Sequence, residues 1–234
     1  MQKSAVLRKK KKFTPFDIVN VAVLSVLMLV VLLPFYYTIV KSLMTQSEFV
    51  MGGTTLWPKE ITFSNYKDIL GTPTMARSFL NTIINVVVGV VYNMFLTTTL
   101  AYGLSRKGFP GRGLFQNLVI FTMYFGGGLI PFFLVVKELG LMGTRLSIVI
   151  PLGLNVFNMI ILRNFFEQLP PDLEEAAKLD GAGPLRIFGQ IILPLVKPAL
   201  ATIVLFYMVD RWNEWFYASL FLGDGKLWTV QLQL

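Results

Sequence analysis

The sequence predicts an all-α membrane protein, built as a polytopic bundle of transmembrane helices. Two observations predict this class. Of the 234 residues, 54% are hydrophobic and only 15% are charged, whereas roughly 25% are charged in a typical soluble domain. The apolar residues also cluster into blocks long enough to cross a bilayer, which takes about 20 residues. A soluble fold of this length needs a polar surface that this composition does not supply.

The missing residue types exclude several kinds of site. Cysteine and histidine are both absent, which excludes disulfides, thiol nucleophiles, Cys/His metal sites and Ser-His-Asp triads. The net charge is +8, and basic proteins often bind nucleic acid. A membrane chain, however, retains Lys and Arg on its cytoplasmic side. We therefore expect no nucleic-acid partner, no metal and no cofactor.

The first span is expected at residues 18–40. It follows a basic N-terminal segment, residues 1–17, that contains the cluster Lys9 to Lys12. A signal peptide is the alternative, but its apolar core would cover only about 7–15 residues before a small-residue cleavage site. This stretch is longer and runs into Lys41, so we predict an uncleaved helix. The basic cluster predicts a cytoplasmic N-terminus.

The remaining chain alternates between polar loops and apolar stretches. Residues 41–76 are polar and rich in turn residues, which predicts an extracytoplasmic loop with a short surface helix over residues 62–70. A loop over residues 163–197 is predicted on the cytoplasmic side. The further spans are expected at residues 79–103, 114–136 (interrupted by Gly126–Gly128 and Pro131), 146–162 and 198–222.

The distribution of positive charge supports this orientation. The inner segments hold 13 Lys and Arg residues and the outer segments hold 7, as the positive-inside rule requires. Five spans that start inside leave the C-terminus outside. The chain stops at Leu234 without a polar tail. We therefore expect a fragment cut shortly before a sixth span.

The chain carries no visible means of hydrolysing ATP. Residues 223–226 read Gly-Asp-Gly-Lys, which lacks the G-x-x-x-x-G-K-[ST] spacing of a phosphate-binding loop. Any energy that the protein uses must then come from a partner or from an ion gradient.

The inner loop predicts two short helices joined by a turn. Pro171 suits a first helical turn, and Glu174 and Lys178 form an i,i+4 pair in the favourable order. Gly181 is expected to end this helix, and a second helix is expected over residues 185–192. Ala176, Ala177 and Gly181 would give the loop a small-residue surface for another protein. An ordinary amphipathic loop is the alternative interpretation.

The string within this loop resembles a known motif. Glu175-Ala176-Ala177, then Gly181, then Ile191-x-Leu193-Pro194 resembles the EAA loop of type I ATP-binding-cassette importer permeases. Asp180-Gly181-Ala182 and Phe188 match the carbohydrate branch. Residues 212–215, Trp-Asn-Glu-Trp, are similar to the Trp-Asn motif of maltose-type permeases. Residues 124–131 and 157–160 resemble the subgroup that handles oligosaccharides and uronate-containing polysaccharide fragments.

The resemblance implies a type I ABC permease fold over residues 77–234, lacking its sixth helix, in a bacterial cytoplasmic membrane. It implies a carbohydrate substrate and four kinds of partner: two ATPase subunits, a second permease subunit, an extracytoplasmic solute-binding protein and membrane lipid. ATP hydrolysis would belong to the ATPase subunits, so the chain is not expected to be an enzyme. Glu175 would pair with a basic residue of the ATPase. The implied coupling residues are Glu175, Ala176, Ala177, Asp180, Gly181 and Ala182.

Polar residues inside the spans are a second candidate site. Asp210, Arg211 and Glu214 lie near mid-membrane, where a charge facing lipid costs about 2.5 kcal/mol or more. We expect them to face the bundle interior or a wet path, with Arg211 and Glu214 as an i,i+3 pair. Asn81 and Asn85 share a helix face and are expected to form interhelical hydrogen bonds rather than substrate contacts.

The aromatic residues near these charges suggest a sugar path. Trp212 lies about 15 Å below the predicted end of its span, at about 1.5 Å per residue, too deep for the interfacial aromatic belt. Sugar rings stack on flat apolar faces and need polar partners for their hydroxyls. Packing against another span is the alternative. The candidate path residues are Asp210, Arg211, Trp212, Asn213, Glu214 and Trp215.

Two other functions remain open. A type I permease for a non-sugar solute shares the coupling loop, although the residues around Trp212 argue against it. A channel or insertase without an ATPase partner has no use for that loop.

Overall fold

The computed structural model describes residues 14–52, 56–223 and 225–234 of the chain. The chain divides into two compact units, Met1–Thr72 and Pro73–Leu234, and each is described by itself. Within the described residues all regular elements are helical, as the sequence predicts. The basic cluster Lys9 to Lys12 lies outside the described residues.

The first unit is dominated by the long helix α1, Pro15–Ser42. Its start is fixed by a capping box, in which Asp17 N donates to Thr14 Oγ1 and Thr14 N donates to Asp17 Oδ2 at 2.9 Å. Its apolar side chains are exposed on all sides, and only Val40 is buried. A helix that is apolar all round suits a lipid environment. The helix is long and apolar enough to cross a membrane, which agrees with the span predicted at residues 18–40.

Two short helices lie between α1 and the end of the first unit. They are α2, Gln46–Met51, and α3, Ser64–Leu70, and α3 agrees with the surface helix predicted at residues 62–70. The side-chain amide of Asn65 donates to the carbonyls of Ser42 and Met44 at 3.1 and 2.9 Å. These bonds tie the start of α3 to the end of α1.

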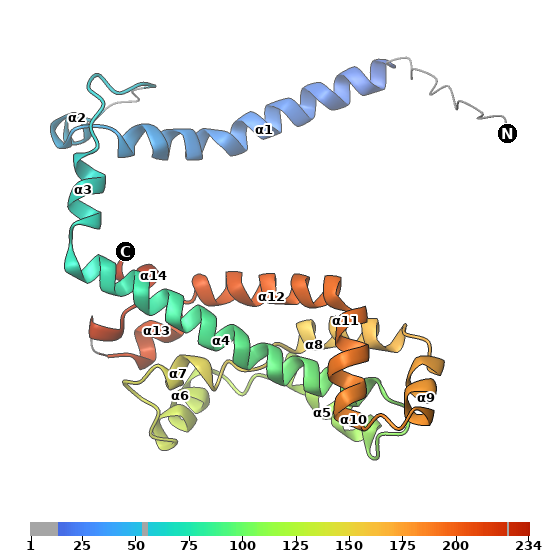
Figure 1. The fold of residues 1–234 in the computed structure, drawn as a ribbon. Coiled ribbons are helices and arrows are strands. Elements are labelled where there is room, and N and C mark those ends of the chain that lie inside the picture. The colour runs from blue at the N-terminus through green and yellow to red at the C-terminus, as the bar shows by residue number, and fades with distance from the viewer. Residues whose placement is uncertain (1–13, 53–55, 224) are drawn as a thin grey trace. The chain divides into compact units, whose positions relative to one another are not determined.

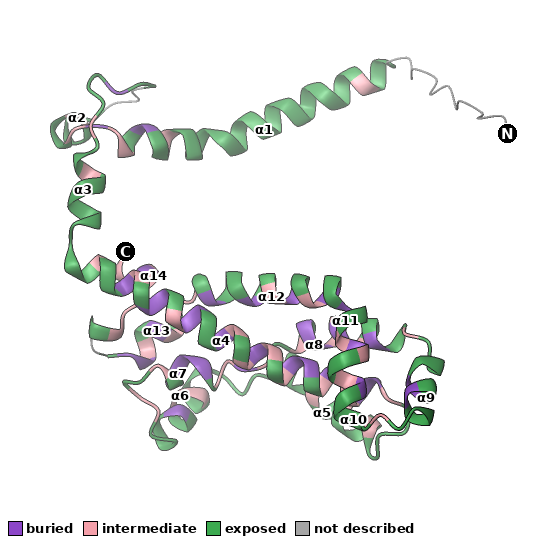
Figure 2. Ribbon diagram, viewed as in Figure 1, coloured by how far each residue is buried: buried purple, intermediate pink, exposed green. Residues whose placement is uncertain are grey.

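The second unit is organised around the longest helix, α4, Pro73–Ser105. Helices α8 (Val156–Glu167) and α12 (Lys197–Trp212) pack along it, and Figure 1 shows α12 running beside α4. The buried positions of α4 are spread along its length (Figure 2). This helix therefore touches most of the second unit.

One predicted span is a bent pair of helices, and a second bent pair joins the predicted loop over residues 163–197 to the fifth span. Helices α5 (Arg112–Tyr124) and α6 (Leu129–Glu138) meet at 116°. The break falls at the glycines that the sequence marked, where Gly127 and Gly128 have φ of 62° and 92°. The segment before α12 comprises α10 (Pro184–Arg186), the π-helix η1 (Ile187–Ile192) and α11 (Leu193–Leu195), and it meets α12 at 84°.

The predicted fourth and fifth spans are also interrupted. Residues 146–162 were predicted as one helix, but α7 covers only Leu146–Val149 before an irregular stretch that precedes α8. Pro151 and Gly153 lie in that stretch. Helix α12 ends at Trp212, and α13 begins anew at Phe216–Phe221, followed by η2 (Gly225–Leu227) and α14 (Val230–Gln233). In the described part of the chain, two single helices are long and apolar enough to cross a membrane, or up to four spans if each bent pair counts as one.

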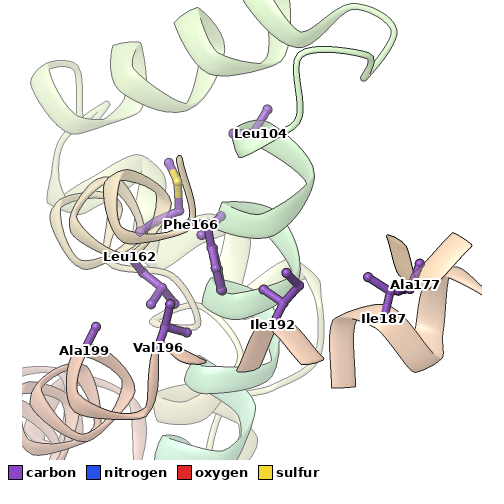
Figure 3. Close-up of a cluster of buried hydrophobic side chains, with 10 residues drawn as sticks. Leu104, Leu162, Phe166, Ala177, Ile187, Ile192, Val196 and Ala199 are labelled. Atoms are coloured by element: carbon purple, nitrogen blue, oxygen red, sulfur yellow. The ribbon is translucent and has the colours of Figure 1, made fainter. Parts of the chain in front are cut away.

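Two apolar clusters hold the second unit together. The larger one joins α4, α8 and the inner loop, through side chains such as Leu104, Phe166, Ile187 and Ile192 (Figure 3). The smaller one contains Phe221 and packs α6, α7 and α13. The larger cluster positions the loop over residues 163–197, and the partly buried side chains packed on the smaller one include Phe132 and Tyr217.

Candidate functional site

The inner loop folds as a helix, a tight turn and a second helix. Helix α9 spans Asp172–Leu179, with three carboxylates in its first turn, where they favourably meet the helix dipole. Gly181 has φ +76°, a conformation that a residue with a Cβ adopts only with strain. In the turn, Gly181 N donates to Lys178 O at 3.0 Å and Ala182 N to Ala177 O at 2.9 Å. The helix before Gly181 and the turn at Gly181 agree with the prediction. The second helix, predicted over residues 185–192, instead extends from Pro184 to Leu195 and is a π-helix over Ile187–Ile192.

The structure divides the candidate coupling residues between two faces. Glu175, Ala176, Asp180 and Gly181 are exposed and Ala182 is half-buried. Ala177 is instead 6% exposed and belongs to the chain's own apolar cluster. The predicted small-residue surface is therefore wrong at Ala177, because one face of α9 must pack on α4 and α8.

Two leucines beside the turn at Gly181 are also exposed, and sequence reasoning missed them. Leu179 and Leu185 are 89% and 85% exposed. They flank the turn at Gly181, one at the end of α9 and the other in α10. The sequence signal for these two leucines is an apolar residue on each side of a glycine turn within a polar loop.

The expected pair between Glu174 and Lys178 is also wrong. Glu174 Oε1 lies 2.7 Å from Arg106 Nη1, just beyond the end of α4. Tyr102 OH donates to the same oxygen at 3.3 Å. Glu174 is buried on the inner face of α9, whereas Lys178 is exposed. Arg106, distant in the sequence, packs within the fold beside Glu174, whereas Lys178, close in the sequence, points away from it.

A second site is a cavity of about 940 Å³ beside the end of α12. Four of the six candidate path residues line it: Asp210, Arg211, Asn213 and Glu214. Trp212 and Trp215 are absent from its lining and are 39% and 55% exposed on other surfaces. The aromatic residues of the lining are Tyr207, Phe132, Phe216 and Tyr217.

Helical spacing explains this division. Tyr207, Asp210 and Arg211 are three and four residues apart and share one face of α12. Trp212 points elsewhere, since adjacent residues on a helix are turned about 100° from each other. The predicted combination of aromatic and polar groups is therefore present, with different aromatic residues.

Arg211 does not pair with Glu214. The three ion pairs within the described residues are Arg106–Glu174, Arg112–Glu167 and Arg163–Glu167. Arg211 is 8% exposed and donates to Asn93 Oδ1 from Nε and Nη2, at 3.1 and 2.9 Å. It also donates to the carbonyls of Ile148 and Leu152.

The stretch between α7 and α8 depends on these bonds. Its carbonyls lack a continuous helix to satisfy them, and buried carbonyls without partners are costly. Asn93 adds two bonds, from Nδ2 to the carbonyls of Leu152 and Gly153 at 2.9 and 3.0 Å. Arg211 and Asn93 together hold this stretch against α4 and α12.

Glu214 has a local role at the cavity wall. Its Oε1 accepts from the backbone N–H of Tyr217 at 2.8 Å, which satisfies a donor in the first turn of α13. This bond fixes the carboxylate where α12 ends and α13 begins.

Asn81 and Asn85 hydrogen-bond to other segments, as expected. Asn81 Nδ2 donates to the carbonyls of Lys226 and Trp228 at 2.9 and 3.0 Å. Asn85 Oδ1 accepts from Arg145 Nη1 at 3.3 Å. These contacts fasten the C-terminal segment and α7 to α4.

Comparison with known proteins gives a consistent result. Residues 7–233 match the family described as "Binding-protein-dependent transport system inner membrane component". Protein LplC of Bacillus subtilis (strain 168) is 43% identical, over 94% of this chain and 74% of its own length. The polygalacturonan/rhamnogalacturonan transport system permease protein YtcP of the same organism is 42% identical, over 94% of this chain and 77% of its own length.

A solved structure gives the same answer for the fold. A chain of a bacterial ABC transporter involved in the import of the acidic polysaccharide alginate superposes with a TM-score of 0.89. It is 37% identical and the match covers 96% of this chain and 81% of that chain. The family match spans both units. The chain therefore belongs to the family of binding-protein-dependent transport system inner membrane components and is a membrane-embedded permease subunit of an ABC importer, in which separate subunits hydrolyse ATP.

Proposed function

We propose that this chain forms one half of an oligosaccharide pathway across a bacterial cytoplasmic membrane. A second permease chain supplies the other half, two ATPase subunits bind from the cytoplasm, and an extracytoplasmic solute-binding protein delivers the sugar. The observation that carries the proposal is the exposed outer face of α9 and its turn, on a chain without a phosphate-binding loop of its own.

The outer face of α9 has the chemistry of a protein docking surface. Glu175 offers a carboxylate to a basic residue of the ATPase, and Ala176 permits close approach. Leu179 and Leu185, 89% and 85% exposed, offer apolar anchors on either side of the turn. Exposed apolar groups rimmed by charge are typical of protein interfaces. Gly181 lets the chain reverse direction between the two leucines.

The cavity beside α12 has the chemistry of a sugar path. Tyr207, Phe132 and Tyr217 present aromatic rings, and Asp210 and Asn213 present polar groups. Ligand cavities typically combine apolar walls with a few polar groups that fix orientation. Two relatives are named for polygalacturonan/rhamnogalacturonan transport and for alginate import. An oligosaccharide is therefore the proposed substrate.

We place the N-terminus and α9 in the cytoplasm and residues 41–76 outside, with five passages through the membrane. Single cysteines test this orientation cleanly, because the chain has none of its own. In intact cells, Lys59→Cys should react with an impermeant thiol reagent and Lys178→Cys should not. Both side chains are exposed, so burial would not explain a difference. External labelling of Lys178→Cys would overturn the orientation.

The coupling role is tested in the assembled transporter. Glu175→Lys places a like charge against the basic partner, so uptake and sugar-stimulated ATP hydrolysis should both fall sharply. The control is Glu138→Lys, which makes the same charge change at an exposed residue ending α6. Equal uptake by the two variants would remove the coupling assignment. Uptake of an amino acid or phosphate instead of sugar would overturn the substrate assignment alone.

A further inference from the structure

The guanidinium group of Arg106 joins three helices, one of which is α9. Arg106 follows the last residue of α4, and its Nη1 lies 2.7 Å from Glu174 Oε1 in α9. Its Nη2 donates to Phe166 O, near the end of α8, at 3.3 Å. Its guanidinium also lies 4.7 Å from the centre of the Tyr102 ring. Helices α4, α8 and α9 therefore meet at Arg106.

Tyr102 extends this junction to the second leg of the loop. Its hydroxyl donates to Glu174 Oε1 at 3.3 Å. Its ring centre lies 5.8 Å from that of Phe166 and 4.7 Å from that of Phe188 in η1. The two helices of the inner loop, α9 and η1, therefore both contact the same turn of α4.

Burial makes this ion pair different from an ordinary surface pair. The Glu174 and Arg106 side chains are 12% and 25% exposed, and pairs shielded from water and salt interact more strongly than exposed ones. Six other charged residues line the same cavity of about 820 Å³. Arg112 and Arg163 both pair with Glu167 at the end of α8, and Lys107, Glu175 and Lys178 are exposed. The Arg106–Glu174 pair is the shielded link between α9 and α4.

Helix α4 carries this link to the intramembrane cavity. It runs without a break from Pro73 to Ser105, and Asn93 lies 13 residues before Arg106, about 20 Å along a helix. Asn93 lines the cavity and accepts from Arg211, another residue of its wall. A displacement of α9 that is passed to α4 therefore reaches the cavity wall through one continuous helix.

We infer that Arg106 is a positioning residue that fastens the coupling helix to α4 and α8, so that movement of α9 driven by the ATPase is transmitted to the cavity. This inference rests on the proposed function, because it takes α9 as the element that the ATPase moves. A clamp that serves only folding would hold the same residues together. It would affect assembly and thermal stability but leave the number of sugars moved per ATP unchanged.

The experiment measures that ratio in the complete complex, reconstituted in proteoliposomes with the solute-binding protein. Arg106→Gln should keep basal ATP hydrolysis and lower the ratio of sugar imported to ATP hydrolysed by about 5-fold or more, the lower end of typical coupling between sites. Lys107→Gln is the matched control, because it removes the same charge from the next residue, which is exposed. It should leave the ratio unchanged.

Glu174→Gln is the second variant, for use if Arg106→Gln fails to assemble. It removes the ion pair but keeps an oxygen for Tyr102, and it should also lower the ratio. An unchanged ratio in whichever of the two variants assembles, or an equal fall in Lys107→Gln, overturns the inference. Failure of both variants to assemble shows a clamp for folding and also overturns it. A wild-type complex that imports no sugar would instead refute the proposed function.

Discussion

Gly89 of α4 lies directly against the side chain of Arg211. A Cβ at position 89 would stand 3.0 Å from Nε and 3.1 Å from Cδ of Arg211. Gly89 and Asn93 are one helical turn apart on α4. Gly89 leaves room for the side chain of Arg211, and Asn93 accepts hydrogen bonds from its guanidinium group. The position of Arg211, and through it of the stretch between α7 and α8, depends on the absence of a side chain at residue 89.

Gly89→Ala should therefore destabilise the protein. The added methyl group requires Arg211 to shift by a few tenths of an ångström, which strains its hydrogen bonds to Asn93, and overpacking of a tight site typically costs about 1–3 kcal/mol. The control is Gly103→Ala in the same helix, where a Cβ would meet no atom within 4 Å. The thermal unfolding midpoint of the purified complex should fall for Gly89→Ala and stay or rise for Gly103→Ala. Equal midpoints would contradict the close contact.

Arg211→Leu should be strongly destabilising for a different reason. It leaves Asn93 Oδ1 and the carbonyls of Ile148 and Leu152 without the guanidinium donor, and each unsatisfied buried group costs about 1–3 kcal/mol. Asp210→Asn is the control, because it changes an exposed neighbour. The yield of folded complex should fall for Arg211→Leu only.

A double-mutant cycle tests the partner. Because Asn93→Leu already removes the amide, the combined loss in Asn93→Leu/Arg211→Leu should be smaller than the sum of the single losses, by about 0.5–3 kcal/mol. Additive losses would show that the two side chains act independently.

Features set by neighbouring residues could be predicted from the sequence. The presence of α1 follows from an apolar run, and the turn after α9 follows from Gly181. The break between α5 and α6 follows from three consecutive glycines. In each case the cause lies within a few residues, so a pattern in the sequence is enough.

Features set by distant residues could not be predicted. Arg211 and Asn93 are 118 residues apart. The residues around Arg211 give no sign of Asn93, so the sequence suggested the nearby Glu214 as its partner. Glu174 likewise binds Arg106 rather than Lys178. Hydropathy gives the length of an apolar stretch but not whether its helix is continuous, which is why the break at Pro151 was missed. Which surface the Trp212 side chain faces depends on which side of α12 packs on α4.

The turn at Gly181 should tolerate no side chain. Its φ is +76°, and a Cβ in that region costs roughly 1–2 kcal/mol. Gly183 is a close control, because its φ of −71° suits any L-residue, and a Cβ at either glycine would meet no atom within 4 Å in this chain. In reconstituted complexes, Gly181→Ala should lower uptake and sugar-stimulated ATP hydrolysis, and Gly183→Ala should have little effect. Loss of both activities in both variants would point to the ATPase interface rather than to the backbone.

The cavity predicts a difference between Asp210 and Trp212. Asp210 lines the cavity, and its side chain takes part in none of the hydrogen bonds described for this part of the chain, so its carboxylate can accept from a sugar hydroxyl. Hydrogen bonds to charged groups are worth about 1.5–3 kcal/mol. Asp210→Asn should therefore raise the sugar concentration for half-maximal uptake by about tenfold or more, with basal ATP hydrolysis unchanged.

Trp212→Ala is the informative comparison, because Trp212 lies outside the cavity lining and is 39% exposed. A large exposed aromatic residue on a membrane helix can pack on a second permease chain or on lipid. Its loss should reduce co-purification of the second permease, while complexes that do assemble should take up sugar with unchanged half-saturation. Weakened sugar uptake in fully assembled Trp212→Ala complexes would return Trp212 to the path, and unchanged uptake in Asp210→Asn would remove Asp210 from it.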